Sequence, residues 1–277
     1  MQEQLSDGHV TPETAADDAA DAGPADDGDS GSGTNAPRRR RRRKRTDWRL
    51  GGTAVRTWDG IVLAIAFVSL GVGVFASQLI PNVWRAPYAG LLSQVALWVG
   101  MLVPVIYAFM RGRPAGLLKF RPVDLLYAVT LGILLRLLQG WMTDAGSQPF
   151  PSATTLDGSL PSDWIVREFI PSALIAPTVE EFFFRTVLLV SIYSVLRRAA
   201  GSFAAGFAAV LVSTATFILM HAVDGSLPVV EALTLGAVGL TCSLLVILTG
   251  RIWGAVLVHI VYNATMLGLI ALGTVLR

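Results

Sequence analysis

The chain has 277 residues, of which 53% are hydrophobic and only 15% are charged, and its mean hydropathy is +0.56. Soluble domains carry about a quarter of their residues as charged side chains, so this composition excludes an ordinary soluble globular protein and indicates a polytopic membrane protein. The net charge of +2 averages over segments of opposite sign and therefore says little about partners.

The N-terminal segment, residues 1–45, is predicted to be a disordered tail. Residues 1–37 contain nine acidic side chains and no Lys or Arg, whereas every residue from Arg38 to Arg45 is basic. Neither stretch can bury enough apolar surface to offset the entropy lost on ordering. The basic run is typical of segments that fix topology and contact anionic lipid head groups. Nucleic acid is not an expected partner, because no folded module beside the run could read bases.

Seven hydrophobic runs follow the tail, and each is long enough to cross a hydrocarbon core about 30 Å thick as a helix. The third run is interrupted by Arg136, and the fourth is long and contains Pro171 and Pro177. The prolines favour a kink, or a short interfacial helix that leads into the span. The sequence therefore predicts an all-α protein with about seven transmembrane helices, at residues 59–80, 88–110, 123–141, 164–196, 203–222, 228–248 and 252–273.

The basic residues between the runs indicate an orientation, because cytoplasmic loops carry an excess of Lys and Arg. The loop 143–163 contains neither Lys nor Arg and is expected outside, together with Arg85 and Arg277. We therefore expect a multi-pass protein of a bacterial inner membrane whose N-terminus faces the cytoplasm. The residues that then fall on the cytoplasmic side with the basic run are Arg111, Arg113, Lys119, Arg121, Arg197, Arg198 and Arg251.

Ionisable side chains inside the predicted spans are candidate functional residues, because a charge at the bilayer centre costs at least about 2.5–3.5 kcal/mol. The fourth run contains Glu180 and Glu181, the fifth contains His221 near its end, and the seventh contains His259. The remaining histidine, His9, lies in the acidic tail and is not a candidate. These buried groups predict a polar cavity within the membrane.

Helical spacing gives the two glutamates different environments. Glu181 and Arg185 are four residues apart, with the acid N-terminal to the base, so they share a helix face and can form an ion pair. Glu180 is rotated by about 100° from Glu181 and cannot use Arg185 in the same way. We therefore expect Arg185 to neutralise Glu181, and Glu180 to remain free to face the cavity.

Two further helices each present a polar face. His259 and Asn263 are four residues apart, as are Phe217 and His221. A carboxylate can take a proton from water, an imidazole can assist or bind a metal, and a carboxamide can donate a hydrogen bond to an oxyanion. Each pattern alone also occurs as a helix-packing device, so the prediction of a site rests on their joint occurrence.

At these residues the sequence resembles the CAAX-prenyl endopeptidase and bacteriocin-processing family of intramembrane proteases, also called the ABI family. The family's Glu-Glu-x-x-x-Arg, Phe-x-x-x-His and His-x-x-x-Asn motifs correspond here to residues 180–185, 217–221 and 259–263. They occur in the family's order, and each lies on a predicted span. The resemblance covers about residues 164–273.

This resemblance implies an intramembrane endopeptidase that hydrolyses peptide bonds of a membrane-associated protein or a small peptide. Glu180 would activate the attacking water with help from His221, and His259 and Asn263 would stabilise the oxyanion of the tetrahedral intermediate. Glu181, Arg185 and Phe217 would support them. The chain would then consist of the tail (1–45), a part with three transmembrane helices and an outer loop (46–163), and a catalytic core (164–277).

Two mechanisms remain open, together with one competing class of non-enzymatic function. Glu180, His221 and His259 could ligate a divalent metal such as zinc, as the His₂Glu set of metalloproteases does. Alternatively, the glutamate could act on water without a metal. A non-enzymatic membrane scaffold or a proton-coupled transporter would use the same buried acid and histidines as a proton relay. The chain shows no internal repeat of the kind that many transporters have.

Overall fold

The structure is a computed structural model that describes residues 47–50, 55–153, 159–223, 225 and 227–276. The chain divides into two units, residues 1–42 and 43–277, and only the second contains described residues. The tail that was predicted to be disordered, including Arg38–Arg45, lies outside the described residues. All regular elements of the described part are helical, which confirms the predicted all-α class.

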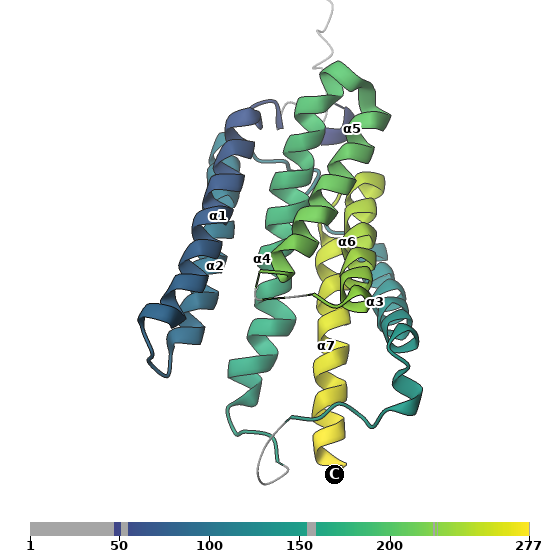
Figure 1. Cartoon of the computed structure of the whole chain (residues 1–277). Coiled ribbons are helices and arrows are strands. Elements are labelled where there is room, and N and C mark those ends of the chain that lie inside the picture. Colours follow the sequence, from purple (N-terminus) through teal and green to yellow (C-terminus); the bar gives the residue numbers. More distant parts are fainter. Residues whose placement is uncertain (1–46, 51–54, 154–158, 224, 226, 277) are drawn as a thin grey trace, which may run out of the picture. The chain divides into compact units, whose positions relative to one another are not determined.

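Figure 1 shows the elements of the described part in the colours of the sequence. Two π-helical stretches, η4 and η5, flank the short helix α4. In chain order the elements are η1 (Trp48–Leu50), α1 (Gly60–Val83), α2 (Ala89–Arg111), α3 (Val123–Met142), η3 (Ala145–Ser147), η4 (Ile165–Ile175), α4 (Ala176–Glu181), η5 (Phe182–Leu188), α5 (Leu189–His221), α6 (Val229–Thr249) and α7 (Trp253–Val275).

Six helices of the described part, rather than the predicted seven, are long and apolar enough to cross a membrane. The difference arises at Gly201, because the stretch Ile165–His221, 57 residues long, counts as one candidate span although it contains two helices that meet there. Gly201 has φ 77° and ψ 173° and divides α5 into two helices across a kink. Glycine reaches positive φ without a Cβ clash, so the chain reverses there without a loop. Figure 1 shows the ribbon of α5 reaching one end of the molecule and turning back.

Close backbone approach holds the outer helices to their neighbours. In the α1–α2 hairpin, a Cβ added to Gly100 would lie 2.8 Å from the Cα of Gly73. At the contact of α3 with α7, a Cβ added to Gly132 would lie 2.8 Å from the Cβ of Val261. Small residues at such crossings allow the tight packing on which helix association in membranes depends.

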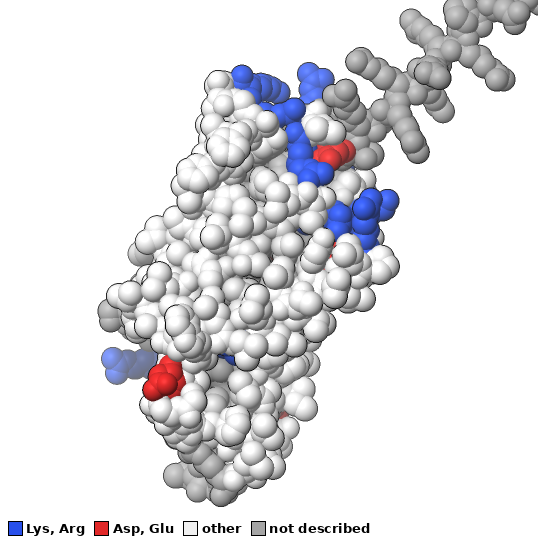
Figure 2. Space-filling view, turned by 90° about the vertical axis from the view of Figure 1, so that its right-hand side faces the viewer, with Lys and Arg blue, Asp and Glu red and all other residues white. Residues whose placement is uncertain are grey.

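Lys and Arg side chains gather at one end of the molecule (Figure 2). Arg56, Arg197 and Arg198 line one surface pocket at this end, and Lys119 and Arg251 are among the residues that line another. The η1 segment contributes to both pockets. Lys119, Arg197, Arg198 and Arg251, which the sequence predicts to lie on one side of the membrane, therefore also lie at one end of the structure. Which side of the membrane this end faces remains a prediction.

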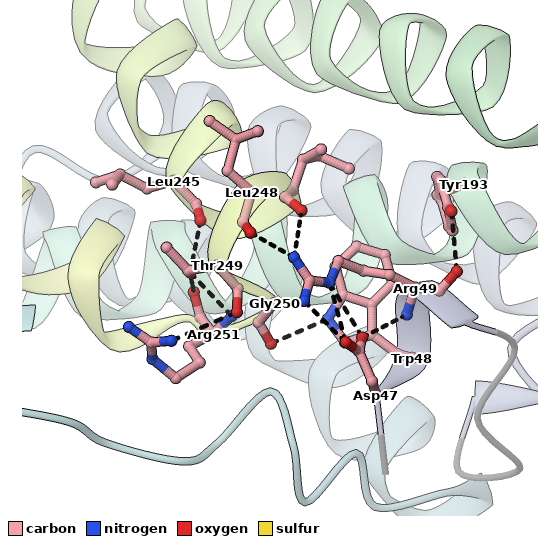
Figure 3. Close-up of polar contacts among 10 residues, drawn as sticks. Asp47, Trp48, Arg49, Tyr193, Leu245, Leu248, Thr249, Gly250 and Arg251 are labelled. Atoms are coloured by element: carbon pink, nitrogen blue, oxygen red, sulfur yellow. Dashed lines mark hydrogen bonds and ion pairs between the residues drawn. The ribbon is translucent and has the colours of Figure 1, made fainter. Parts of the chain in front are cut away.

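Hydrogen bonds connect the η1 segment both to α5 and to the turn between α6 and α7 (Figure 3). The Trp48 indole donates to the carbonyl of Gly250, 3.1 Å away, and Gly250 itself has φ 73°. The Arg49 guanidinium donates to the last carbonyls of α6, including that of Ile247 at 3.1 Å, while the Tyr193 hydroxyl donates to the Arg49 carbonyl. These bonds satisfy acceptors that a helix end leaves unpaired.

Candidate functional site

Glu181 lies at the end of α4 and is held from two sides. Its Oε1 atom is 3.0 Å from Nη1 of Arg185 and 3.0 Å from Nδ1 of His259. The side chains of Glu181 and Arg185 have no exposed surface. The ion pair expected from the four-residue spacing is thus present, and it also connects to α7 through His259.

Arg185 is enclosed by an aromatic ring and a backbone carbonyl. Its guanidinium carbon lies 4.5 Å from the centroid of the Phe217 ring, and Nη2 donates to the carbonyl of Gly239 at 3.2 Å. A Cβ added to Gly239 would lie 3.3 Å from that nitrogen, so the glycine allows α6 to approach the arginine. Gly239 was not among the predicted site residues. The available signal was a glycine in the interior of a predicted helix, which often marks a close approach.

Glu180 faces away from Arg185, into a cavity of about 490 Å³ that is also lined by His221. Its side chain is 16% exposed, and its Oε2 atom lies 3.9 Å from Nε2 of His259. His259 therefore lies between the two glutamates, with one ring nitrogen directed toward each. The two ring nitrogens of a histidine have different roles, and the partner of one decides what the other can do.

His221 ends α5, and its Nδ1 atom lies 2.9 Å from the carbonyl of Phe217. When Nδ1 donates to this carbonyl, Nε2 of the neutral ring remains an acceptor on the cavity side. The Phe217 ring packs against both imidazoles, with centroids 4.6 Å from His221 and 5.7 Å from His259. Phe217 thus packs against the guanidinium of Arg185 and the rings of both histidines.

Asn263 lies one turn after His259 on α7, and its Nδ2 atom donates to the carbonyl of Ser172 in η4 at 2.9 Å. Asn263 is not among the residues that line the cavity of Glu180 and His221. The structure therefore does not bring the Asn263 amide to the cavity wall that these two residues form. The contact with Ser172 has no signal in the sequence, because every residue carries a backbone carbonyl.

The opposite wall of this cavity is formed by α1 and α2, which lie outside the core predicted at residues 164–277. Their contribution was missed, although polar residues within two otherwise apolar runs were a signal that could have been followed. The residues of α1 and α2 that line the cavity are Ser77, Gln78, Pro81, Gly90, Ser93, Gln94, Leu97 and Met101.

The residues considered for zinc do not fit a metal ion in this arrangement. Among the residues that the structure describes, no group of three or more His, Cys, Asp or Glu side chains is placed to hold one. The mechanism proposed below is therefore derived from the side chains alone.

The fold and the site define a class of protein: a multi-pass membrane protein with two glutamates and two histidines gathered among its helices. Residues 162–265 match the family model described as Rce1-like, type II CAAX prenyl endopeptidase. This match includes all three motifs, so residues 162–265 are similar to the CAAX prenyl endopeptidase family over the part of the chain that carries the candidate site. Searches of curated proteins and of solved structures gave no significant match.

Proposed function

We propose that this chain is an intramembrane endopeptidase in which Glu180 is the general base. The family of residues 162–265 supports a CAAX-type intramembrane protease activity. The observation that carries the assignment to Glu180 is the contrast between the two neighbouring glutamates. Glu181 is fully buried against Arg185, whereas Glu180 lines the cavity together with His221.

In the proposed reaction a water molecule lies in the cavity near Glu180 and His221. The Glu180 carboxylate takes a proton from this water while the water oxygen forms a bond to the scissile carbonyl carbon. The tetrahedral intermediate carries its negative charge on the former carbonyl oxygen. When the C–N bond breaks, the proton held by Glu180 passes to the leaving nitrogen, which yields a carboxylic acid and an amine.

His259 is the proposed electrostatic partner of the intermediate. Glu181 contacts Nδ1 of His259 at 3.0 Å, which fixes the orientation of the ring as a carboxylate does in other His-dependent hydrolases. Nε2 is then directed toward the reacting region near Glu180, and it can donate to the oxyanion when the ring carries a proton on both nitrogens.

The chemical character of the cavity walls favours a membrane-associated peptide as the substrate. Its lining combines apolar side chains, such as Leu97 and Met220, with hydroxyl and amide groups, such as Ser93 and Gln94. An extended peptide within the bilayer requires hydrogen-bond partners for its backbone, because lipid offers none. We place the protein in the inner membrane of a bacterium with a cytoplasmic N-terminus, where Arg38–Arg45 would contact anionic lipid head groups.

The activity can be tested by incubating the purified full chain in proteoliposomes with a library of membrane-associated peptides in H₂¹⁸O. Cleavage by an activated water predicts one ¹⁸O atom in each new carboxyl group, detected by mass spectrometry. Prolonged treatment with a metal chelator should leave the rate unchanged. Absence of cleavage across the library, while the protein stays folded, would favour the scaffold or transporter alternative. Loss of activity on chelation, restored by zinc, would contradict the metal-free mechanism.

A further inference from the structure

A second cavity, of about 560 Å³, lies at the opposite end of α3 from the Lys- and Arg-rich surface. It is enclosed by the last turns of α3, the segment around η3, and α7, and it shares no lining residue with the cavity of Glu180. Its walls are largely apolar and include Phe150, Met266 and Leu269, and Arg136 is the cation among its lining residues.

Arg136 is bonded only to neutral groups in the described part of the chain. Its Nε donates to the Thr265 hydroxyl at 3.3 Å, and its two terminal nitrogens donate to the side-chain oxygen of Gln139 and the carbonyl of Tyr262. The guanidinium carbon also lies 4.0 Å from the centroid of the Tyr262 ring. A guanidinium has five N–H donors, so two remain beyond these three hydrogen bonds.

The other arginines buried among the helices have acidic partners. Arg185 pairs with Glu181 at 3.0 Å, and Arg251 pairs with Asp124 at 2.7 Å. No acidic side chain within the described ranges forms an ion pair with Arg136. A cation in an apolar span is costly unless it is paired, and the cavity beside Arg136 leaves room for an anion from outside the chain.

We propose that this cavity binds the anionic head group of a membrane lipid, with a phosphate on Arg136. The apolar walls favour an amphiphile over a free ion, because they can contact the adjoining acyl chain. Arg136 precedes the end of α3 at Met142 by six residues, which corresponds to about 9 Å along the helix. At about this distance from the helix end, a long arginine side chain can place its guanidinium near the lipid head groups. The site does not involve Glu180 and is independent of the proposed protease activity.

Binding can be measured on the delipidated full chain in neutral detergent, by native mass spectrometry and by the thermal unfolding midpoint. The probes are phosphatidylglycerol, phosphatidylcholine and inorganic phosphate. Phosphatidylglycerol should raise the midpoint, whereas phosphatidylcholine and inorganic phosphate should not. Arg136→Gln should weaken phosphatidylglycerol binding at least about tenfold, because one charge-assisted contact is lost. Arg167→Gln is the matched control, since the Arg167 side chain is 80% exposed, and it should bind phosphatidylglycerol as the wild type does.

Leu269→Trp provides a second variant in case Arg136→Gln fails to fold. It narrows the cavity and leaves the hydrogen-bond partners of Arg136 in place, so it should reduce phosphatidylglycerol binding without lowering the midpoint of the lipid-free protein. Wild-type binding by both Arg136→Gln and Leu269→Trp would overturn the proposal and assign the lipid to the basic end of the molecule. A full shift with inorganic phosphate would overturn the lipid as ligand and leave a site for free anions.

Discussion

The Nδ1 atom of His259 lies 3.0 Å from the Oε1 atom of Glu181. The same carboxylate oxygen lies 3.0 Å from Arg185, so one buried acid connects an arginine of its own helical segment to a histidine of α7. Within the described ranges no arginine forms an ion pair with the neighbouring Glu180, and Nε2 of His259 lies 3.9 Å from its Oε2 atom. Roles of the two glutamates thus follow from what surrounds each of them.

Arg185→Met should strongly destabilise the protein, because it leaves the charge of Glu181 buried without a cation. Breaking a buried pair from one side costs about 3–5 kcal/mol, measured here by unfolding in detergent. The double variant Glu181→Gln, Arg185→Met should be less destabilised than Arg185→Met alone, since no isolated charge remains. Equal stability of the single and double variants would contradict the assignment of an ion pair.

Gly239→Ala should lower the free energy of unfolding by about 1–3 kcal/mol, as overpacking of a tight core does. The added Cβ would lie 3.1 Å from Cγ2 of Thr214 and 3.3 Å from Nη2 of Arg185. Gly236→Ala is the matched control on the same helix, because its Cβ would meet Ile218 at an ordinary 3.5 Å. The control should be neutral or stabilising, since alanine favours a helix. A neutral Gly239→Ala would show that α6 does not approach Arg185 as closely as described.

Gln94→Leu should reduce kcat/KM for a membrane-associated peptide by roughly tenfold, as expected when a hydrogen bond to the substrate is lost. Gln94 lies on the α2 wall of the cavity, opposite Glu180. Val95→Ala is the control on the neighbouring position, whose side chain is 40% exposed, and it should retain wild-type kinetics. An unchanged kcat/KM for Gln94→Leu would exclude this part of the α2 wall from substrate binding.

The pH dependence of stability should contain a contribution from Asp47. Its hydrogen bond with the Arg49 guanidinium holds the pKa of the Asp47 carboxyl below its usual value. A carboxyl whose pKa is lowered by folding stabilises the protein above its unfolded pKa and loses that contribution as the pH falls through the folded pKa. The difference in unfolding midpoint between wild type and Asp47→Asn should therefore be constant near neutrality and shrink below about pH 4. A difference that persists unchanged at lower pH would contradict this role.

Much of the fold could be predicted from the sequence because local patterns determine it. The apolar runs define the helices, and the spacing of Glu181 and Arg185 within one helical segment is enough to predict their contact. The count of seven spans is not confirmed by length and hydropathy, which give six in the described part, because the two helices of α5 meet at Gly201 without a loop between them. The polar residues Arg197 and Arg198, which suggested a loop, lie within α5 itself.

The tertiary part of the site could not be predicted. The position of His259 between Glu180 and Glu181 depends on how α7 packs against α4, and no spacing along the chain encodes this. The same holds for the α1 and α2 wall, which lies far from the motifs in sequence. The hydrogen bond from the Asn263 amide to the Ser172 carbonyl could not be foreseen either, because it depends on how α7 packs against η4.

The most direct test of the account compares Glu180→Gln with Glu181→Gln in single-turnover cleavage of one identified peptide. Glu180→Gln should lower the cleavage rate by about 10²–10⁴, the usual contribution of a general base, while its unfolding midpoint and its affinity for the peptide stay near those of the wild type. Glu181→Gln should lower the midpoint, because it leaves the charge of Arg185 buried and unpaired. Wild-type cleavage by a folded Glu180→Gln protein would contradict the central claim.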